Sequence, residues 1–168
     1  MFNNNQNNQK TVMAFGTFDI FHDGHEHFLK QAKKFGDYLI IVVARDKTVR
    51  QIKGETPLNN ESHRMETLRK SGLADKVIAG DLTDKYKAIR KYRPEVIVLG
   101  YDQMVFTQKL HKILIDIKLD ARIERLDAFF PQVFKSSLLK QKMEIEPSED
   151  IMGLKTQLTS NTIRNNTN

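Results

Sequence analysis

Two histidines three residues apart have the spacing and the chemistry of a phosphate-transfer site. His22 and His25 lie in the string GTFDIFHDGH, which covers residues 16–25. At this spacing the two imidazoles can share one side of a helix start, and Gly24 leaves room between them. Imidazoles placed there can donate hydrogen bonds to non-bridging phosphate oxygens as charge develops during transfer. We therefore expect both histidines to be catalytic.

The residues before the pair suit a bound phosphate as well. Gly16 ends an apolar run and allows the backbone to approach a ligand closely, and Thr17 offers a hydroxyl and a backbone N–H. The helix expected next would present unpaired N–H groups and the positive end of its dipole, which together attract anions. Asp19 is expected to orient His22 or the acceptor rather than to act as a nucleophile.

A metal centre is the alternative for this histidine-rich string. Residues 22–27 read HDGHEH, and His and carboxylate side chains are good ligands for zinc or iron. However, His25 and His27 would point to different sides of a helix, and no second cluster of such residues follows later in the chain. A metal hydrolase is therefore disfavoured, and no metal ligand is assigned.

Alternating apolar and amphipathic segments are expected to position these residues. Apolar segments predict strands at Thr11–Gly16, Tyr38–Ala44, Lys76–Ala79, Glu95–Gly100 and Ala121–Leu126. Amphipathic segments predict helices at His25–Phe35, ended by Gly36, and at Glu61–Ser71, Asp84–Tyr92, Thr107–Ile117 and Ser136–Met143. This alternation predicts an α/β fold, a Rossmann-like open, doubly wound sheet of five parallel strands with helices on both faces. Ligands bind such sheets at the carboxyl ends of the strands, where the strand order reverses.

Composition narrows the class of protein further. The chain has 168 residues, which favours one domain, and no Cys, which excludes disulfides, a thiol nucleophile and Cys-ligated metals. We expect a disordered polar arm over residues 1–10, the domain over 11–146 and a polar tail over 147–168. The longest apolar run, Tyr38–Ala44, is far shorter than the roughly 20 residues that span a bilayer. The first residues are polar and Asn-rich, without an apolar stretch, so no signal peptide is expected. A cytoplasmic protein without membrane contact is expected.

The charge of the chain favours anionic partners. Its formal net charge is +6, and both nucleic acid and small phosphorylated molecules would be attracted to it. The basic residues do not form one dense block with interleaved aromatic residues, which a nucleic-acid surface would favour. Small phosphorylated ligands are therefore expected, and nucleic acid is not.

The string GTFDIFHDGH, the helix after it and the segment GDYLIIVVARD together resemble the HxGH nucleotidyltransferase superfamily, the cytidylyltransferase-like group. The resemblance runs from about Thr11 to Met143. The group includes glycerol-3-phosphate cytidylyltransferase and the archaeal-type FAD synthetases. It implies transfer of AMP or CMP from ATP or CTP to a small phosphorylated acceptor, with release of pyrophosphate. It also implies Mg2+ carried by the nucleotide, and a homodimer.

Later segments extend the resemblance. Lys47 and Lys53 fall in what looks like the family's basic loop, which approaches the triphosphate, and we expect both to be catalytic. Arg64 matches an Arg beside the family's active site. The string LGYDQ after the fourth strand looks more like the FAD synthetase branch, and FKSS at the last helix fits the family's ISSTxI motif. The residues expected to bind the nucleotide are Gly16, Thr17, Phe18, Asp19, Gly24, Arg64, Gly100, Asp102, Lys135, Ser136 and Ser137.

Several alternatives stay open at the level of the sequence. Some members carry an Arg where this chain has Phe130, so either Lys135 replaces its charge or the chain belongs with members that lack it. Ser136 could be an ordinary helix N-cap. A second match to ISSTxI, at Thr159–Arg164, lies in the polar tail with no strand before it.

The acceptor is the least determined part of the function. FMN with ATP, giving FAD, is the first expectation, and CTP with glycerol 3-phosphate or another polyol phosphate is the alternative. A nucleotide- or RNA-binding module that has lost catalysis is an alternative of another class. The intact histidine pair argues against that alternative.

Overall fold

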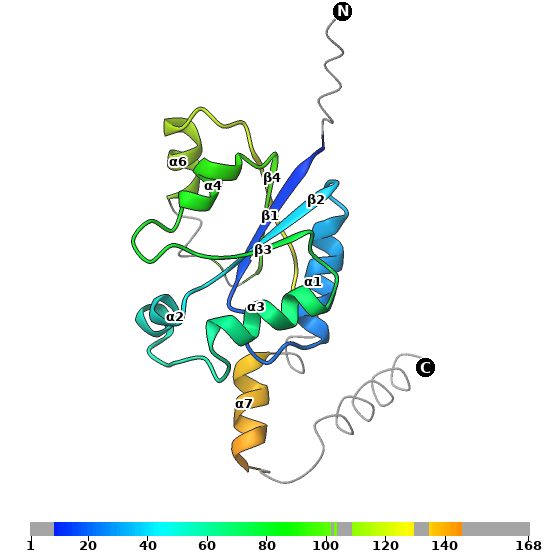
Figure 1. Cartoon of the computed structure of the whole chain (residues 1–168), viewed down its shortest axis with the longest axis vertical. Coiled ribbons are helices and arrows are strands. Elements are labelled where there is room, and N and C mark those ends of the chain that lie inside the picture. The colour runs from blue at the N-terminus through cyan, green and yellow to red at the C-terminus, as the bar shows by residue number, and fades with distance from the viewer. Residues whose placement is uncertain (1–8, 102, 104–108, 130–134, 146–168) are drawn as a thin grey trace, which may run out of the picture.

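The computed structural model describes residues 9–101, 103, 109–129 and 135–145 (Figure 1). Five strands form one sheet: β1 (Thr11–Gly16), β2 (Tyr38–Val43), β3 (Lys76–Ala79), β4 (Val96–Leu99) and β5 (Arg122–Arg125). All neighbouring strands are parallel, and their order in the sheet is β3-β2-β1-β4-β5. The predicted fold class is therefore confirmed. Within these residues, no helix has the length and hydrophobicity that crossing a lipid bilayer requires.

The strand order reverses at β1, which has β2 on one side and β4 on the other. The chain first builds outward from β1 to β3, and then crosses to the opposite side of β1 to add β4 and β5. Ala14 of β1 pairs with Ile41 on one side and with Val98 on the other. The carboxyl ends of β1 and β4 therefore border the crevice where this class of sheet binds ligands.

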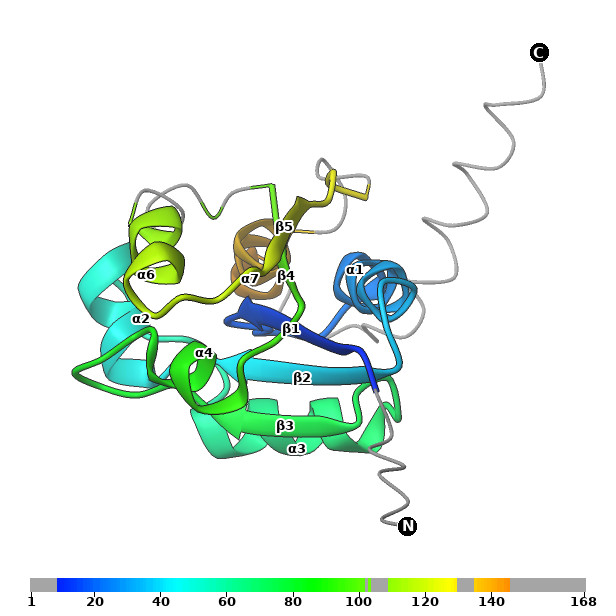
Figure 2. The ribbon, with the colours of Figure 1, turned by 90° about the horizontal axis from the view of Figure 1, so that it is seen from above.

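Helices cover both faces of the sheet, as Figure 2 shows from above. One face carries α1 (Asp23–Lys33) and α3 (Glu61–Lys70), and the other carries α4 (Lys87–Tyr92) and α6 (Leu110–Asp116). Successive side chains of a strand point to opposite faces, and β1 is buried on both. Val12 and Ala14 join the core beneath the first pair of helices. Met13 and Phe15 join the core beneath the second pair.

One helix was not expected from the sequence. Residues that look like a basic loop form α2 (Asp46–Lys53), so the expectation of a loop there is wrong. The helix ends at Gly54, whose φ of 78° is the left-handed conformation that glycine tolerates. Its apolar side has two members, Val49, which is buried, and Ile52, which is exposed, so the helical pattern covers a single turn and was not recognised in the sequence.

Other helix boundaries follow from local hydrogen bonds. Asn60 caps α3, because its side-chain oxygen accepts a hydrogen bond from the His63 N–H at 2.9 Å. The first helix begins at Asp23, two residues earlier than predicted, because His22 caps it. The last described helix is α7 (Ser136–Ile145), close to the predicted segment. The arm at 1–8 and the tail at 147–168 lie outside the described residues.

Gly36 does not end α1 as expected. The C-cap of α1 is Lys34, in right-handed helical conformation, and Gly36 instead allows two backbone segments to touch. A Cβ at Gly36 would lie 2.5 Å from the carbonyl oxygen of Lys10 and 2.8 Å from Cγ2 of Val12. Glycine is therefore required at this position for packing of the turn against the start of β1.

We expect the substitution Gly36→Ala to lower the free energy of unfolding by about 1–3 kcal/mol, because the carbonyl group of Lys10 cannot move away as a flexible side chain would. Urea denaturation followed by circular dichroism measures the change. Lys34→Ala, at an exposed position of the same turn, is the control and should change stability by less than about 0.5 kcal/mol. Equal midpoints for the two variants would show that the close approach is not needed.

Candidate active site

His22 and His25 meet at the start of α1, beyond the carboxyl end of β1. His22 is the N-cap residue, with extended backbone, and its Nδ1 accepts a hydrogen bond from the His25 backbone N–H at 3.4 Å. The two rings stack with their centroids 3.8 Å apart and their planes 20° apart. The hydrogen bond at the N-cap therefore places the ring of His22 over the ring of His25. The two imidazoles lie together, as the sequence led us to expect.

The ring of His25 is enclosed by aromatic neighbours. Phe18 meets it edge-on at 5.4 Å between centroids, and Phe21 stacks on it at 5.8 Å. Its Nδ1 is buried and has no hydrogen-bond partner among the described residues. Burial, followed by the positive charges of His22 and Lys53, lowers the pKa of His25 to about 3. His25 is consequently neutral at neutral pH, and its ring carries one N–H rather than a full positive charge.

Ser136 brings the start of α7 to the histidine pair. Its hydroxyl donates to the carbonyl oxygen of Asp19 at 2.6 Å, and its Oγ lies 3.5 Å from Nε2 of His22. Because Nδ1 of His22 accepts a hydrogen bond, a neutral His22 ring has its proton on Nε2, facing Ser136. Ser136 is the first residue of α7. Its hydroxyl does not cap its own helix but binds the loop between β1 and α1, residues 17–22, which we call the motif loop. Figure 1 shows α7 beyond the end of the sheet at which β1 finishes.

The loop between β1 and α1 has a strained backbone. Phe18 and Ile20 both have positive φ, 55° and 47°, which non-glycine residues rarely adopt. The ring of Phe18 is buried in the core beneath α1, so a ligand contact from this residue would come from its main chain. A Cβ at Gly16 would lie 2.7 Å from that ring, so glycine is needed to admit Phe18. Strain of this kind persists where surrounding contacts overdetermine the conformation, as functional loops often show.

Asp19 has a structural role that the sequence did not predict. Its carboxylate accepts hydrogen bonds from the backbone N–H groups of Leu58 at 2.7 Å and Asn59 at 3.0 Å, and from Nδ2 of Asn59 at 3.2 Å. Burial by itself would raise the pKa of Asp19, but the bonds from Asn59 and Leu58 outweigh it and lower the pKa. The carboxylate therefore binds the turn between α2 and α3, residues 54–60, and the expectation that Asp19 orients His22 or the acceptor stays a prediction.

Arg64 lies beneath the site rather than in it. Only 1% of it is exposed, and its guanidinium donates to the carbonyl oxygens of Asn59, Thr17 and Ala44. It also pairs with Asp46 at 2.7 Å. These bonds tie the ends of β1 and β2 to α2 and α3. A lone Arg in a helical segment gives no sign of burial in the sequence, since such residues are usually exposed.

Lys47 and Lys53 stand on α2, one in its first turn and one at its end. Both are exposed, and neither forms a hydrogen bond or ion pair with another described residue. The positive charge of Lys53 is one of the causes that lower the pKa of His25. Gly24 lies in the first turn of α1, next to that pair, and Thr17 is half-buried in the motif loop.

The carboxyl end of β4 closes the other side of the crevice. The carbonyl oxygen of Gly100 accepts a hydrogen bond from Nη1 of Arg125 at 2.8 Å. The side chain of Gln103 donates from Nε2 to the carbonyl oxygen of Phe15 at 2.6 Å, and so links the ends of β4 and β1. Sequence analysis missed this linking role of Gln103. Asp102 and Phe130 lie outside the described residues, as does the alternative motif at 159–164.

The remaining predicted residues lie at the start of α7. Lys135, just before the helix, and Ser137, in its first turn, are both exposed. A residue that sequence analysis missed is Lys140, one turn further on, whose Nζ donates to the carbonyl oxygen of Thr56 at 3.1 Å. The spacing of four residues from Ser136, which puts two side chains on one helix face, could have revealed it.

A metal centre has no structural support in the part of the chain described. No group of three His, Asp or Glu side chains comes together there. His27, the third histidine of the string, stacks on Phe129 with ring centroids 4.3 Å apart. The stacked arrangement of His22 and His25 therefore lacks the additional ligands that zinc or iron would need.

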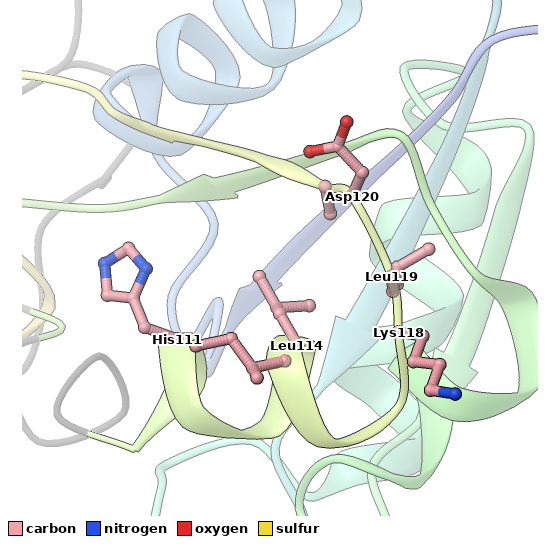
Figure 3. A pocket seen from close by; sticks show the side chains of 7 residues that line it. His111, Leu114, Lys118, Leu119 and Asp120 are labelled. Atoms are coloured by element: carbon pink, nitrogen blue, oxygen red, sulfur yellow. The ribbon is translucent and has the colours of Figure 1, made fainter.

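A hollow of about 410 Å³ lies away from the histidine pair, between α6 and the turn that leads into β5 (Figure 3). Its lining includes Leu114, Lys118 and Asp120, which surround the turn that leads into β5. This turn is at the amino end of β5, whereas the histidine pair follows the carboxyl end of β1. The hollow is therefore separate from the candidate active site.

Stability should depend on pH through His25. Its pKa falls from an ordinary value of 6.5 to about 3 on folding, so between these values the unfolded chain binds a proton that the folded protein does not. Stability is then fully present above pH 6.5 and is lost as the pH falls, by about 1.4 kcal/mol per pH unit. Between pH 7 and pH 5 we expect wild type to lose about 2 kcal/mol more than His25→Asn in urea unfolding. Equal losses would contradict a neutral, buried His25.

Comparisons with known proteins agree with this geometry. The family model described as cytidylyltransferase-like matches residues 13–156. The FAD synthase of Thermoplasma acidophilum is 37% identical over 132 residues, which are 79% of this chain and 92% of that protein. The FAD synthase of Archaeoglobus profundus is 43% identical over 117 residues, 70% of this chain and 74% of that protein.

A solved structure is similar over the same region. The crystal structure of a Thermoplasma volcanium protein, described as a lipopolysaccharide core biosynthesis protein, superposes with a TM-score of 0.68. It is 36% identical and covers 72% of this chain and 98% of its own. The histidine pair, the parallel sheet and these relatives agree, and the chain belongs to the cytidylyltransferase-like family of nucleotidyltransferases.

Proposed function

We propose that this protein is an FAD synthase, which transfers AMP from ATP to FMN. The observation that carries the chemistry is the stacked pair of His22 and His25 beside the first turn of α7. The choice of acceptor is supported by the similarity to archaeal FAD synthases over most of the chain. The same relatives give no support to a polyol phosphate acceptor.

The reaction is a direct in-line substitution at phosphorus. A phosphate oxygen of FMN attacks the α-phosphorus of ATP, and a new P–O–P bond forms there. The bond from the α-phosphorus to the oxygen that bridges it to the β-phosphorus breaks, and that oxygen leaves with pyrophosphate. No covalent intermediate with the protein is needed, so catalysis consists of positioning and stabilisation of charge.

Each group of residues has one task in this scheme. His22 and His25 donate hydrogen bonds to oxygens of the α- and β-phosphates, where charge increases in the transition state. Lys47 and Lys53, exposed on α2, draw charge from the departing pyrophosphate. The hydroxyl of Ser137 and the first amides of α7, that of Ser136 among them, hold the β- and γ-phosphates, since a helix N-terminus binds anions. The hydroxyl of Ser136 itself donates to the carbonyl oxygen of Asp19.

A nucleotide bound here would carry its own Mg2+. The described residues do not gather a set of metal ligands, and the carboxylate of Asp19 is already engaged by N–H donors. These contacts fit a magnesium ion held by phosphate oxygens and water rather than by a protein cage. When bound, the ion neutralises the charge of the triphosphate.

The setting of this activity is also part of the proposal. The enzyme works in the cytoplasm as a homodimer, on small phosphorylated molecules and without nucleic acid or membrane as a partner. The net charge of +6 and the scattered basic residues support small anionic substrates.

Pyrophosphate release by the purified protein tests the substrate pair. With Mg2+ present, we expect release with ATP and FMN and formation of FAD, identified by chromatography. CTP with glycerol 3-phosphate should give little product. Turnover with CTP and a polyol phosphate alone would overturn the choice of FMN and leave the family assignment intact.

The histidine pair is tested by His22→Ala. Loss of a hydrogen-bond donor aimed at developing charge typically lowers turnover about 10²–10³-fold, and we expect at least that loss in kcat. His63→Ala, an exposed histidine on α3, is the matched control and should keep wild-type turnover. If His22→Ala retained full turnover, the site would not be catalytic, and a nucleotide-binding module would be the better description.

A further inference from the structure

One face of α7 contacts Asp19 of the motif loop through two side chains. Ser136 and Lys140 are four residues apart, so their side chains leave the helix on the same side. The hydroxyl of Ser136 donates to the main-chain carbonyl of Asp19 at 2.6 Å. Nζ of Lys140 lies 3.6 Å from the carboxylate of the same Asp19. The helix is therefore held against Asp19 both at its first residue and one turn later.

Lys140 also reaches the segment 54–60. Its Nζ donates to the carbonyl oxygen of Thr56 at 3.1 Å and lies 3.9 Å from the carboxylate of Glu55. Its side chain is only 18% exposed, whereas the next two residues of α7, Gln141 and Lys142, are exposed. An isolated exposed ion pair contributes little, but the ammonium of this half-buried lysine reaches three acceptor groups from two segments of the chain. These contacts therefore fix where α7 lies.

Asp19 does not depend on Lys140 in return. Its carboxylate already accepts two hydrogen bonds from backbone N–H groups of Leu58 and Asn59 and one from the Asn59 side chain. Removing the ammonium would leave this carboxylate well solvated by N–H donors. The consequence of losing Lys140 should therefore fall on the placement of α7 rather than on the motif loop or the fold.

We propose that Lys140 is a positioning residue, which locks α7 onto the segment 54–60 and so holds Ser136 and the first amides of α7 at the triphosphate. Lys140 acts through the helix and does not touch the substrate. A displacement of about 1 Å in a group that positions a substrate can cost about 10²-fold in rate. The inference rests on the proposed nucleotide site but not on the identity of the acceptor.

The test measures ATP affinity and helix docking separately. Calorimetric titration with ATP and Mg2+, without FMN, gives the dissociation constant, and hydrogen exchange gives the protection of residues 135–145. For Lys140→Met we expect ATP binding at least about tenfold weaker and faster exchange in 135–145, with unchanged exchange in α1 and α3. Lys140→Arg should restore affinity to within about threefold of wild type.

Lys142→Met is the matched control, since Lys142 is an exposed lysine on the same helix, and it should match wild type in both measurements. Hydrogen exchange separates an indirect role from a direct one. Weaker ATP binding with wild-type exchange in 135–145 would mean direct phosphate contact and would overturn the proposal. So would wild-type affinity in Lys140→Met.

The outcomes also distinguish this inference from the proposed function. If wild type forms no FAD but binds ATP, and Lys140→Met weakens that binding, the choice of FMN fails and the positioning role stands. If wild type forms FAD and Lys140→Met binds ATP and turns over equally well, the positioning role fails and the FAD synthase proposal stands.

Discussion

The buried carboxylate of Asp19 is the constraint on which the candidate site depends. Its side chain and its main-chain carbonyl together bind the segment 54–60 and the first residue of α7. These segments are far apart in the chain, and no strand pairing joins them. A charge buried in this way is stable because several N–H donors replace its lost hydration. The loop that carries His22 is therefore fixed from outside as well as by its own helix.

Arg64 gives the same region a second buried anchor. It binds carbonyl oxygens at the ends of β1 and β2, and it pairs with Asp46 at the start of α2. The hydrogen bonds of Arg64 and Asp19 together offset the conformational cost of the positive φ angles at Phe18 and Ile20. Such a satisfied polar network rigidifies the structure around it, so that the donors of the site are in place before a ligand binds. Preorganisation of this kind is what charge stabilisation in a transition state requires.

The environment of His25 sets the character of the site. Aromatic rings on two sides and the stacked ring of His22 keep its pKa near 3, so it acts as a neutral donor. In the proposed reaction, the exposed ammonium groups of Lys47 and Lys53 would supply positive charge. A triphosphate would then meet these lysines at the rim and the buried, neutral ring of His25 inside. Fixed donors lose little entropy on binding, whereas long lysine side chains can follow the leaving group.

Local patterns were sufficient for much of this protein. Unbroken apolar runs such as Tyr38–Val43 identified the strands, since burial on both faces of a parallel sheet leaves no alternation. The HxGH string located the histidine pair, because its chemistry depends on a spacing of three residues in one turn. The helix α2 escaped prediction, since its apolar side consists of Val49 and the exposed Ile52, a pattern that covers a single turn.

The sequence by itself determined the sheet, the family and the position of the two histidines. Only the tertiary structure decided what Asp19, Arg64 and Lys140 do, because most of their partners are distant in the chain. Lys140 lies 84 positions from Thr56, Arg64 lies 47 positions from Thr17, and Asp19 lies 117 positions from Ser136. A charged residue has the same local pattern whether it faces a ligand, solvent or another segment. Its role is fixed by which acceptors and donors the fold brings within about 3 Å of it.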